Sequence, residues 1–166
     1  CACGQAALEI SIAQMINGGN LSWDDIINRI KYIVPRVNSL FTVRELSYMK
    51  AGGRIGGAAA FLGNLVNIKP VCEFINGEVH VVKAVRGRKK SLNALVDIAA
   101  SRINNVNNSV IVTQHALSPD DEKFLINGFR SRLNYQGEIY QGLVGTTVGA
   151  HSGPGSIGIG FVEVGV

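Results

Sequence analysis

The chain has 166 residues, enough for one domain of ordinary size and few for two. Hydrophobic residues make up 46% of it and charged residues only 17%, which is the opposite of the balance in a disordered chain. The formal net charge of +4 suits an anionic ligand or partner but is too small to indicate nucleic-acid binding by itself.

The cysteines and the hydropathy pattern indicate a cytoplasmic protein. Three cysteines are too few for a disulfide framework, and their odd number favours a reducing compartment. Cys1 and Cys3 lack a second pair of Cys or His at ligand spacing, so no metal site is predicted. The longest uncharged stretch, 139–162, contains seven glycines and does not predict a membrane-spanning helix. No signal peptide is recognised.

Two helices are predicted at the start of the chain. Apolar residues at helical spacing predict a first helix that ends at Gly18 and Gly19. Ser22 is the predicted N-cap of a second helix, with acidic residues in its first turn. Pro35 is expected to kink or end this helix, whose apolar stripe consists of Ile26, Ile27, Ile30, Ile33 and Val37.

A strand and two more helices are predicted next. Residues 40–43 indicate a short strand, and the spacing of Thr42 and Glu45 predicts a capping box for a helix that stops at the glycines 52–53. Residues 56–65 predict another apolar helix. A β-hairpin follows, in which strands 68–75 and 78–85 flank Asn76 and Gly77, the preferred pair for a type I′ turn.

Helices and strands alternate in the rest of the chain. Because the tight hairpin requires an antiparallel pair, the sequence predicts an α/β domain of two layers, with helices packed on a mixed sheet. In the last strand, glycines alternate with apolar residues, and a bare face of this kind lets a helix or a ligand approach closely. The predicted elements are a helix at 92–103, a strand at 110–112, a helix at 118–133, a strand at 138–144, a glycine-rich loop at 145–155 and a strand ending near Val164.

Two glycine-rich segments contain side chains suited to an anion. Arg54 stands between two glycine pairs before a predicted helix, and its planar guanidinium matches a carboxylate or a phosphate. His151 lies with Ser and Thr residues in the loop 145–155, where it can hydrogen-bond an oxyanion. For both segments the alternative is an ordinary turn with solvated polar side chains, and this alternative stays open.

The basic run 86–90 has two interpretations. It is either a solvated helix start or a docking surface for an acidic partner. Nucleic acid is disfavoured as a partner because no aromatic residue is interleaved with these charges. No nucleophile elbow and no phosphate-binding Walker loop occur in the sequence.

Four segments together resemble the DegV family. They are 41–55 (FTVRELSYMKAGGRI), 67–70 (NIKP), 85–90 (VRGRKK) and 149–155 (GAHSGPG), in the order and spacing of that family. The resemblance covers nearly the whole chain. It implies a protein that binds a long-chain fatty acid such as palmitate, without a cofactor. Some members are the fatty-acid-binding subunit of bacterial fatty acid kinase, in which a separate catalytic subunit phosphorylates the carboxylate of the bound acid.

The resemblance also implies roles for particular residues. Arg54 and His151 are expected to meet the fatty acid carboxylate, and Arg86 and Arg88, both expected to be exposed, to face the kinase. The family further implies a non-catalytic protein without nucleic-acid partners or stable membrane insertion. The expected lining of the acyl chain and its loop consists of Ile55, Phe61, Leu62, Ser152 and Gly153.

Family members have an additional N-terminal domain. The resemblance therefore implies that the helical segment 1–37 packs on such a domain, and that 38–166 is the C-terminal DegV-like lipid-binding domain. The sequence leaves two rival hypotheses open. In one, the loops of Arg54 and His151 hold a small phosphorylated metabolite, bound or converted by an enzyme. In the other, the protein is an interaction module whose only functional feature is the basic run 86–90.

Overall fold

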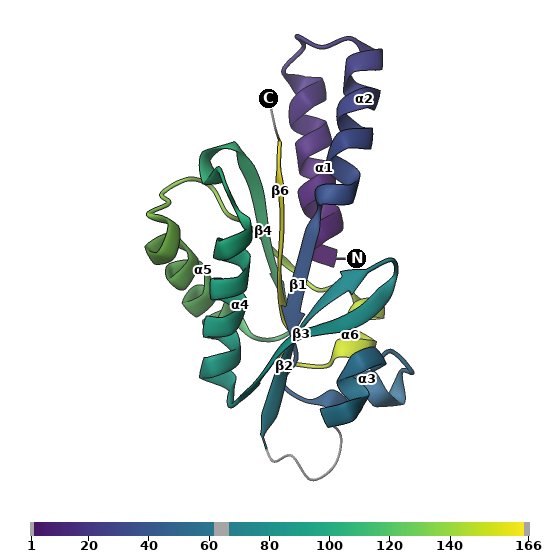
Figure 1. Ribbon diagram of the computed structural model, residues 1–166, viewed down its shortest axis with the longest axis vertical. Coiled ribbons are helices and arrows are strands. Elements are labelled where there is room, and N and C mark those ends of the chain that lie inside the picture. The colour runs from purple at the N-terminus through teal and green to yellow at the C-terminus, as the bar shows by residue number, and fades with distance from the viewer. Residues whose placement is uncertain (1, 62–66, 165–166) are drawn as a thin grey trace.

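The computed structural model describes residues 2–61 and 67–164 (Figure 1). In this part of the chain, helices and strands form an α/β domain on a mixed sheet, as predicted. The helices are α1 (Ala2–Asn17), α2 (Trp23–Ile33), α3 (Leu46–Ala51), α4 (Arg88–Arg102), α5 (Pro119–Leu133) and α6 (Thr146–Ser152), with 3₁₀ helices η1 (Val34–Arg36), η2 (Gly56–Phe61) and η3 (Val106–Asn108). The strands are β1 (Asn38–Thr42), β2 (Ile68–Ile75), β3 (Glu78–Arg86), β4 (Ser109–His115), β5 (Tyr140–Leu143) and β6 (Ile157–Glu163).

The six-stranded sheet has the order β3-β2-β1-β6-β4-β5. Only the pair of β4 and β5 is parallel, and the other neighbouring strands are antiparallel. Asn76 and Gly77 both have positive φ, at 50° and 83°, as the predicted type I′ hairpin turn requires. The sheet is therefore mixed because a parallel edge strand is added to an antiparallel array.

Helices cover both faces of this sheet (Figure 1). Helices α4 and α5 pack on one face, where the larger core gathers around Leu40, Leu95, Phe129 and Phe161. Helix α1 packs on the opposite face, mainly against β6 and β4. Residues 38–164 thus supply the sheet, the layer of α4 and α5, and the short helices α3 and α6, and α1 packs on the face opposite α4 and α5.

The bare face of β6 explains the close approach of α1. A Cβ atom added to Gly160 would overlap the backbone of Cys3, and one added to Gly158 would lie 3.0 Å from the Cys3 sulfur. The predicted alternation is confirmed, since Ile157, Ile159 and Phe161 point into the core on the other face. The missing side chains of β6 are what let the first turn of α1 rest directly on the sheet.

The second helix begins as predicted. The Ser22 side chain accepts a hydrogen bond from the Asp25 amide, and the Asp25 carboxylate accepts one from the Ser22 amide, which makes a capping box. Pro35 ends the helix within η1. The predicted box of Thr42 and Glu45 is wrong, because Thr42 is still in β1 and its hydroxyl donates to the Pro70 carbonyl at 2.8 Å. Glu45 is itself the N-cap of α3.

Two further predictions require correction. The helix expected at 56–65 is the 3₁₀ helix η2 as far as Phe61, and residues 62–66 lie outside the described part. The expected loop at 145–155 contains the helix α6. Its glycines lie mostly at the ends, since Gly145 is the N-cap and Gly153, with φ of 75°, is the C-cap. The segment between these two glycines forms helical hydrogen bonds, such as that from Gly153 N to Gly149 O at 2.8 Å.

Candidate functional site

A cavity of about 150 Å³ lies on the sheet face that α1 covers, below the first turn of that helix. Its floor is formed by β1, β2, β4 and β6, and its walls by α3, α6 and the start of α1. The lining is mostly apolar. It consists of Ala2, Cys3, Ser39, Phe41, Met49, Arg54, Phe74, Val79, Gln114, Val144, Val148, His151, Ser152, Ser156, Ile157 and Gly158.

The end of α3 determines the position of Arg54. Gly53 has φ of 67° and donates to the Lys50 carbonyl at 3.1 Å, and the Arg54 amide donates to the Met49 carbonyl at 2.9 Å. These two bonds are those of a Schellman motif, which needs a left-handed residue at the position of Gly53. Arg54 follows this motif at the cavity lining, and its Nη1 donates to the Gly52 carbonyl at 2.9 Å.

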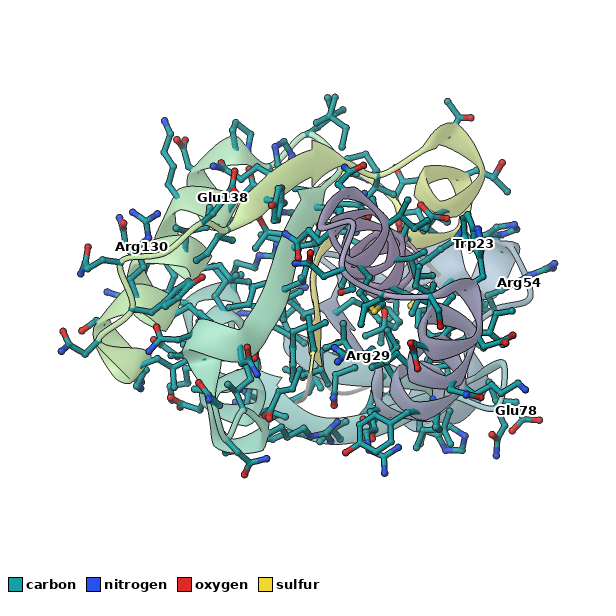
Figure 2. All side chains as sticks on the ribbon, turned by 90° about the horizontal axis from the view of Figure 1, so that it is seen from above. Trp23, Arg29, Arg54, Glu78, Arg130 and Glu138 are labelled. Carbon is teal, nitrogen blue, oxygen red and sulfur yellow. The ribbon has the colours of Figure 1, made fainter. Side chains whose placement is uncertain are left out.

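The Arg54 guanidinium is exposed. Figure 2 shows its side chain at the edge of the molecule, directed away from the sheet. No ion pair is recorded for it within the described ranges. Arg54 therefore stands at the mouth of the cavity with a charge that no neighbouring carboxylate neutralises.

His151 lies in the last turn of α6 and faces Gly52 at the end of α3. A Cβ atom added to Gly52 would overlap the imidazole at Nδ1, so the absence of a side chain at Gly52 makes room for the ring. The Nδ1 atom is buried and has no hydrogen-bond partner among the described residues. The fold thus brings together the two glycine-rich segments that the sequence singled out, through contact of α3 with α6.

The expected lining residues differ in their positions. Ser152 lines the cavity, and its hydroxyl is 2.8 Å from the hydroxyl of Ser156. Gly153 is buried against Tyr48, whose ring a Cβ atom would overlap. Ile55 and Phe61 are half-buried and are not part of the lining in the part of the chain described here. Leu62 lies outside the described residues.

Several lining residues were not identified from the sequence. Phe41 and Phe74 stack with ring centroids 5.0 Å apart, and Gln114 projects from β4 beside them in the lining. The Gln114 Oε1 atom is buried without a hydrogen-bond partner among the described residues. A signal for Gln114 was present, since it interrupts the apolar alternation of Val110 and Val112 on one face of β4.

The basic run does not form one exposed surface. Arg86 ends β3 and is exposed, as expected. The expectation for Arg88 is wrong, because its side chain is only 17% exposed at the start of α4. Its Nε and Nη2 atoms donate to Asp121 Oδ2 at 3.0 and 2.9 Å, and Nη2 also donates to the Gly155 carbonyl at 2.5 Å. Arg88 is occupied by the fold and joins α4, α5 and the loop after α6.

Asp121 is the centre of this ion-pair cluster. The carboxylate also accepts hydrogen bonds from Arg44 Nη2 at 3.1 Å and from the Ser118 hydroxyl. Burial alone raises the pKa of the Asp121 carboxyl, but the hydrogen bonds from Ser118, Arg88 and Arg44 and the Arg88 charge outweigh it. The pKa therefore lies below its usual value, and Asp121 is ionised at neutral pH.

The described residues contain neither a metal-binding cluster nor a membrane-spanning helix. Across residues 2–61 and 67–164, no cluster of three or more His, Cys, Asp or Glu side chains could hold a metal ion. None of the helices in these ranges is long and apolar enough to cross a membrane. The cavity with Arg54 and His151 is thus the candidate site.

The chain matches the sequence model of a family described as uncharacterised DegV proteins over residues 1–164. It is 34% identical over 161 residues to a DegV domain-containing protein of Clostridium acetobutylicum, covering 96% of this chain and 57% of the relative. Protein DegV of Bacillus subtilis is 29% identical over 158 residues, covering 93% and 55%. The chain spans about half the length of these relatives.

Solved structures resemble the fold closely. A stearic acid-binding protein of Eubacterium ventriosum superposes with a TM-score of 0.86 at 25% identity, covering 98% of this chain and 56% of that one. A fatty acid-binding DegV family protein of Streptococcus agalactiae has a TM-score of 0.81 at 25% identity, covering 96% and 56%. Both similar proteins are described as binding fatty acids.

Proposed function

Since the chain belongs to the DegV family, we propose that it binds a long-chain fatty acid and offers the carboxylate to a partner kinase. The observation that supports this most strongly is the composition of the cavity. An apolar interior lies behind Arg54, whose recorded side-chain bond within the described residues is to the Gly52 carbonyl, and behind His151, whose buried Nδ1 has no partner there. An amphiphile with one anionic end fits such a site.

The apolar lining is suited to the acyl chain. Phe41, Phe74 and Val79 from the sheet and Met49 and Val148 from the helices surround the cavity. Burying a methylene contributes about 0.8 kcal/mol, so the methylenes of palmitate together supply roughly 11 kcal/mol before ordering costs. A cavity that covers only part of the chain supplies a proportional share.

The carboxylate end is assigned to Arg54 and His151. A fatty acid carboxylate is ionised at neutral pH and needs charged or polar donors once it leaves water. The Arg54 guanidinium offers two parallel donors that match a carboxylate. The buried His151 Nδ1 lacks a partner among the described residues, and as an N–H it gives the second contact. Ser152 lies one residue further in the same lining.

The rival hypothesis of a phosphorylated metabolite finds less support. A phosphate needs several donors around it, whereas most of this lining is apolar side chain. A sugar or nucleoside would also need polar partners along the cavity, where Phe41 and Phe74 stack instead. The non-catalytic interpretation is preferred, with any chemistry done by the partner.

Presentation to a kinase is supported by the position of the head group. Arg54 lies at the surface, so an acid held by it has its carboxylate at the mouth of the cavity (Figure 2). We assign the docking contact to Arg86, which is exposed, and to exposed neighbours such as Lys89 and Lys90. Arg88 contributes by bonding the Gly155 carbonyl and so holding the loop that follows α6.

The segment 1–37 is proposed to pack on a further domain of the whole protein. Trp23, Ile27 and Val34 recur at helical spacing along α2 and η1 and are 68%, 46% and 48% exposed. The opposite side of this segment packs inward, since Ile26 and Ile33 are buried. An exposed apolar stripe of this kind is typical of an interface. Residues 38–166 then supply the rest of the lipid-binding domain, in which Ala2 and Cys3 of α1 complete the cavity lining.

Native mass spectrometry of protein purified from bacterial cells tests the binding function. A retained mass that matches a long-chain fatty acid and disappears after delipidation is the expected result. A retained phosphorylated small molecule would support the rival hypothesis instead. No acid retained, together with no binding of added palmitate, would contradict the proposal.

A further inference from the structure

Gln114 lies in an unusual position on the sheet. Its register partner on β5 is Gly142 and its register partner on β6 is Gly158, so both flanking strands are bare beside it. A Cβ atom added to Gly142 would lie 3.5 Å from Cγ and Nε2 of Gln114. Gly142 thus leaves space for the Gln114 amide, which lines the cavity, whereas the bare side of Gly158 is faced by Cys3 and Phe41.

The carbonyl oxygen of this amide is unpaired within residues 2–61 and 67–164. Gln114 Oε1 is buried and accepts no hydrogen bond from a described residue. The lining contains donors in Arg54, Ser152 and Ser156, but none of them bonds this oxygen, and Phe41, Val144 and Val148 have no side-chain donors. A buried acceptor that stays unpaired is destabilising, so a bound donor at this position would be favoured.

A carboxylate is the wrong partner for this oxygen. An ionised carboxylate only accepts hydrogen bonds, and so does the Gln114 carbonyl. The matching group on a ligand is a donor, and on an otherwise apolar acyl chain the simplest donor is a hydroxyl. Gln114 and His151 line the same small cavity, and Val148 lines it one turn before Ser152 in α6. The hydroxyl therefore belongs to the part of the chain near the carboxylate.

We infer that Gln114 makes this cavity selective for fatty acids with a hydroxyl group close to the carboxyl end. The inference rests on the proposed function, because it presumes an acyl chain in the cavity. Gln114 acts by accepting the hydroxyl proton in a hydrogen bond. It takes no part in holding the carboxylate.

The test compares the affinity of the full chain for four ligands by displacement of a fluorescent fatty acid. These are palmitate, 3-hydroxypalmitate, 3-methoxypalmitate, which lacks the donor, and 16-hydroxypalmitate, which has its hydroxyl at the far end. The parent is expected to bind 3-hydroxypalmitate about three- to tenfold more tightly than palmitate, as one net hydrogen bond allows. The methoxy and 16-hydroxy acids are expected to show no such gain.

Variants assign the gain to Gln114. Gln114→Leu and Gln114→Met are both expected to lose the preference for 3-hydroxypalmitate, so that the ratio of the two affinities, measured on the same variant, falls to about one. Gln141→Leu, at an exposed position on β5 beside Gly142, is the matched control and keeps the preference. Two different replacements of Gln114 are used in case one of them folds poorly. Thermal unfolding measures whether each variant is folded.

Three results would overturn the inference. Equal affinity of the parent for palmitate and 3-hydroxypalmitate would contradict it while leaving the proposed function intact. A preference that persists in both Gln114 variants would assign the selectivity to another residue. Failure of all four acids to bind would contradict the proposed function as well.

Discussion

Arg54 and Arg88 look alike in the sequence, since each stands beside glycine and each was predicted to serve the function. In the fold they lie in different surroundings. Arg54 is exposed at the cavity mouth and makes one bond, to the carbonyl of Gly52. Arg88 is 17% exposed, makes two bonds to Asp121 and one to the Gly155 carbonyl.

This difference in hydrogen bonding determines which arginine is available to a ligand or partner. A guanidinium that is paired with a largely buried carboxylate, as Arg88 is with Asp121, cannot leave it without removing an ion pair from that carboxylate. A guanidinium at the surface that is bonded to a backbone carbonyl can turn toward an incoming anion with a small loss of free energy. Arg88 therefore stabilises the framework of the site, and Arg54 acts in it.

The largest expected effect is on the Asp121 cluster. Asp121→Ala removes the partner of Arg88 and Arg44 and is expected to lower the free energy of unfolding by about 2–4 kcal/mol, as for a largely buried pair. Asp120→Ala is the matched control in the same helix turn, because Asp120 is 98% exposed, and it should cost less than about 1 kcal/mol. Urea unfolding measures both. Equal effects would mean that the cluster is ordinary surface charge.

The same cluster has a predictable pH dependence. The pKa of Asp121 is lowered in the folded protein from its ordinary value of 3.8, so its stabilisation is complete above that value and is lost as the pH falls through the lower, folded pKa. The stability difference between the parent and Asp121→Ala should stay constant from neutral pH down to weakly acidic pH and shrink once the pH is below 3.8. Unfolding curves across this range measure it. A difference that grows on acidification would reverse the assigned direction.

An intermediate effect is expected where the two predicted segments touch. Gly52→Ala places a methyl group against the His151 ring and should displace it, with a loss of roughly 1–3 kcal/mol in stability and weaker palmitate binding. Gly149→Ala is the matched control within α6. Nothing lies within 4 Å of its added Cβ, so it should stabilise the protein by about 0.5–1 kcal/mol. If Gly52→Ala bound palmitate like the parent, His151 would have no part in the carboxylate site.

The smallest effect on the fold is expected for Arg86. Arg86→Glu should change the unfolding free energy by less than about 0.5 kcal/mol, because the side chain is exposed and no ion pair is recorded for it within the described residues. It should leave palmitate binding unchanged and weaken acyl phosphate formation in an assay with the kinase. Lys31→Glu makes the same charge change on α2 and serves as control. Unchanged turnover for Arg86→Glu would remove the docking role.

Local patterns were sufficient for much of the fold. The capping box of Ser22, the hairpin at Asn76 and Gly77 and the glycine end of α3 depend on neighbouring residues and follow from rules of short range. The glycine content of 145–155 predicted a loop, although this segment contains the helix α6. Gly145 and Gly153 cap the two ends of this helix, and the ends are defined only by the hydrogen bonds that form in the fold.

The site was only partly predictable for a related reason. Arg54 and His151 were found from their glycine-rich surroundings, but their meeting depends on Gly52 fitting the imidazole across the contact of α3 with α6. The burial of Arg88 depends on Asp121, which is distant in sequence and was predicted only as part of a helix start. The surroundings of Gln114 could not be predicted without the strand order, because its two glycine partners lie on β5 and β6.

The central claim is that Arg54 holds the carboxylate of a bound fatty acid. The most direct test measures the affinity of palmitate and of methyl palmitate for the parent and for Arg54→Ala, with Arg132→Ala, whose partner is the exposed Asp97, as control. Arg54→Ala should weaken the binding of palmitate by about 1.5–3 kcal/mol, the range for a hydrogen bond to a charged group, and leave the binding of the ester unchanged. Equal binding of palmitate by the parent and by Arg54→Ala would contradict the account.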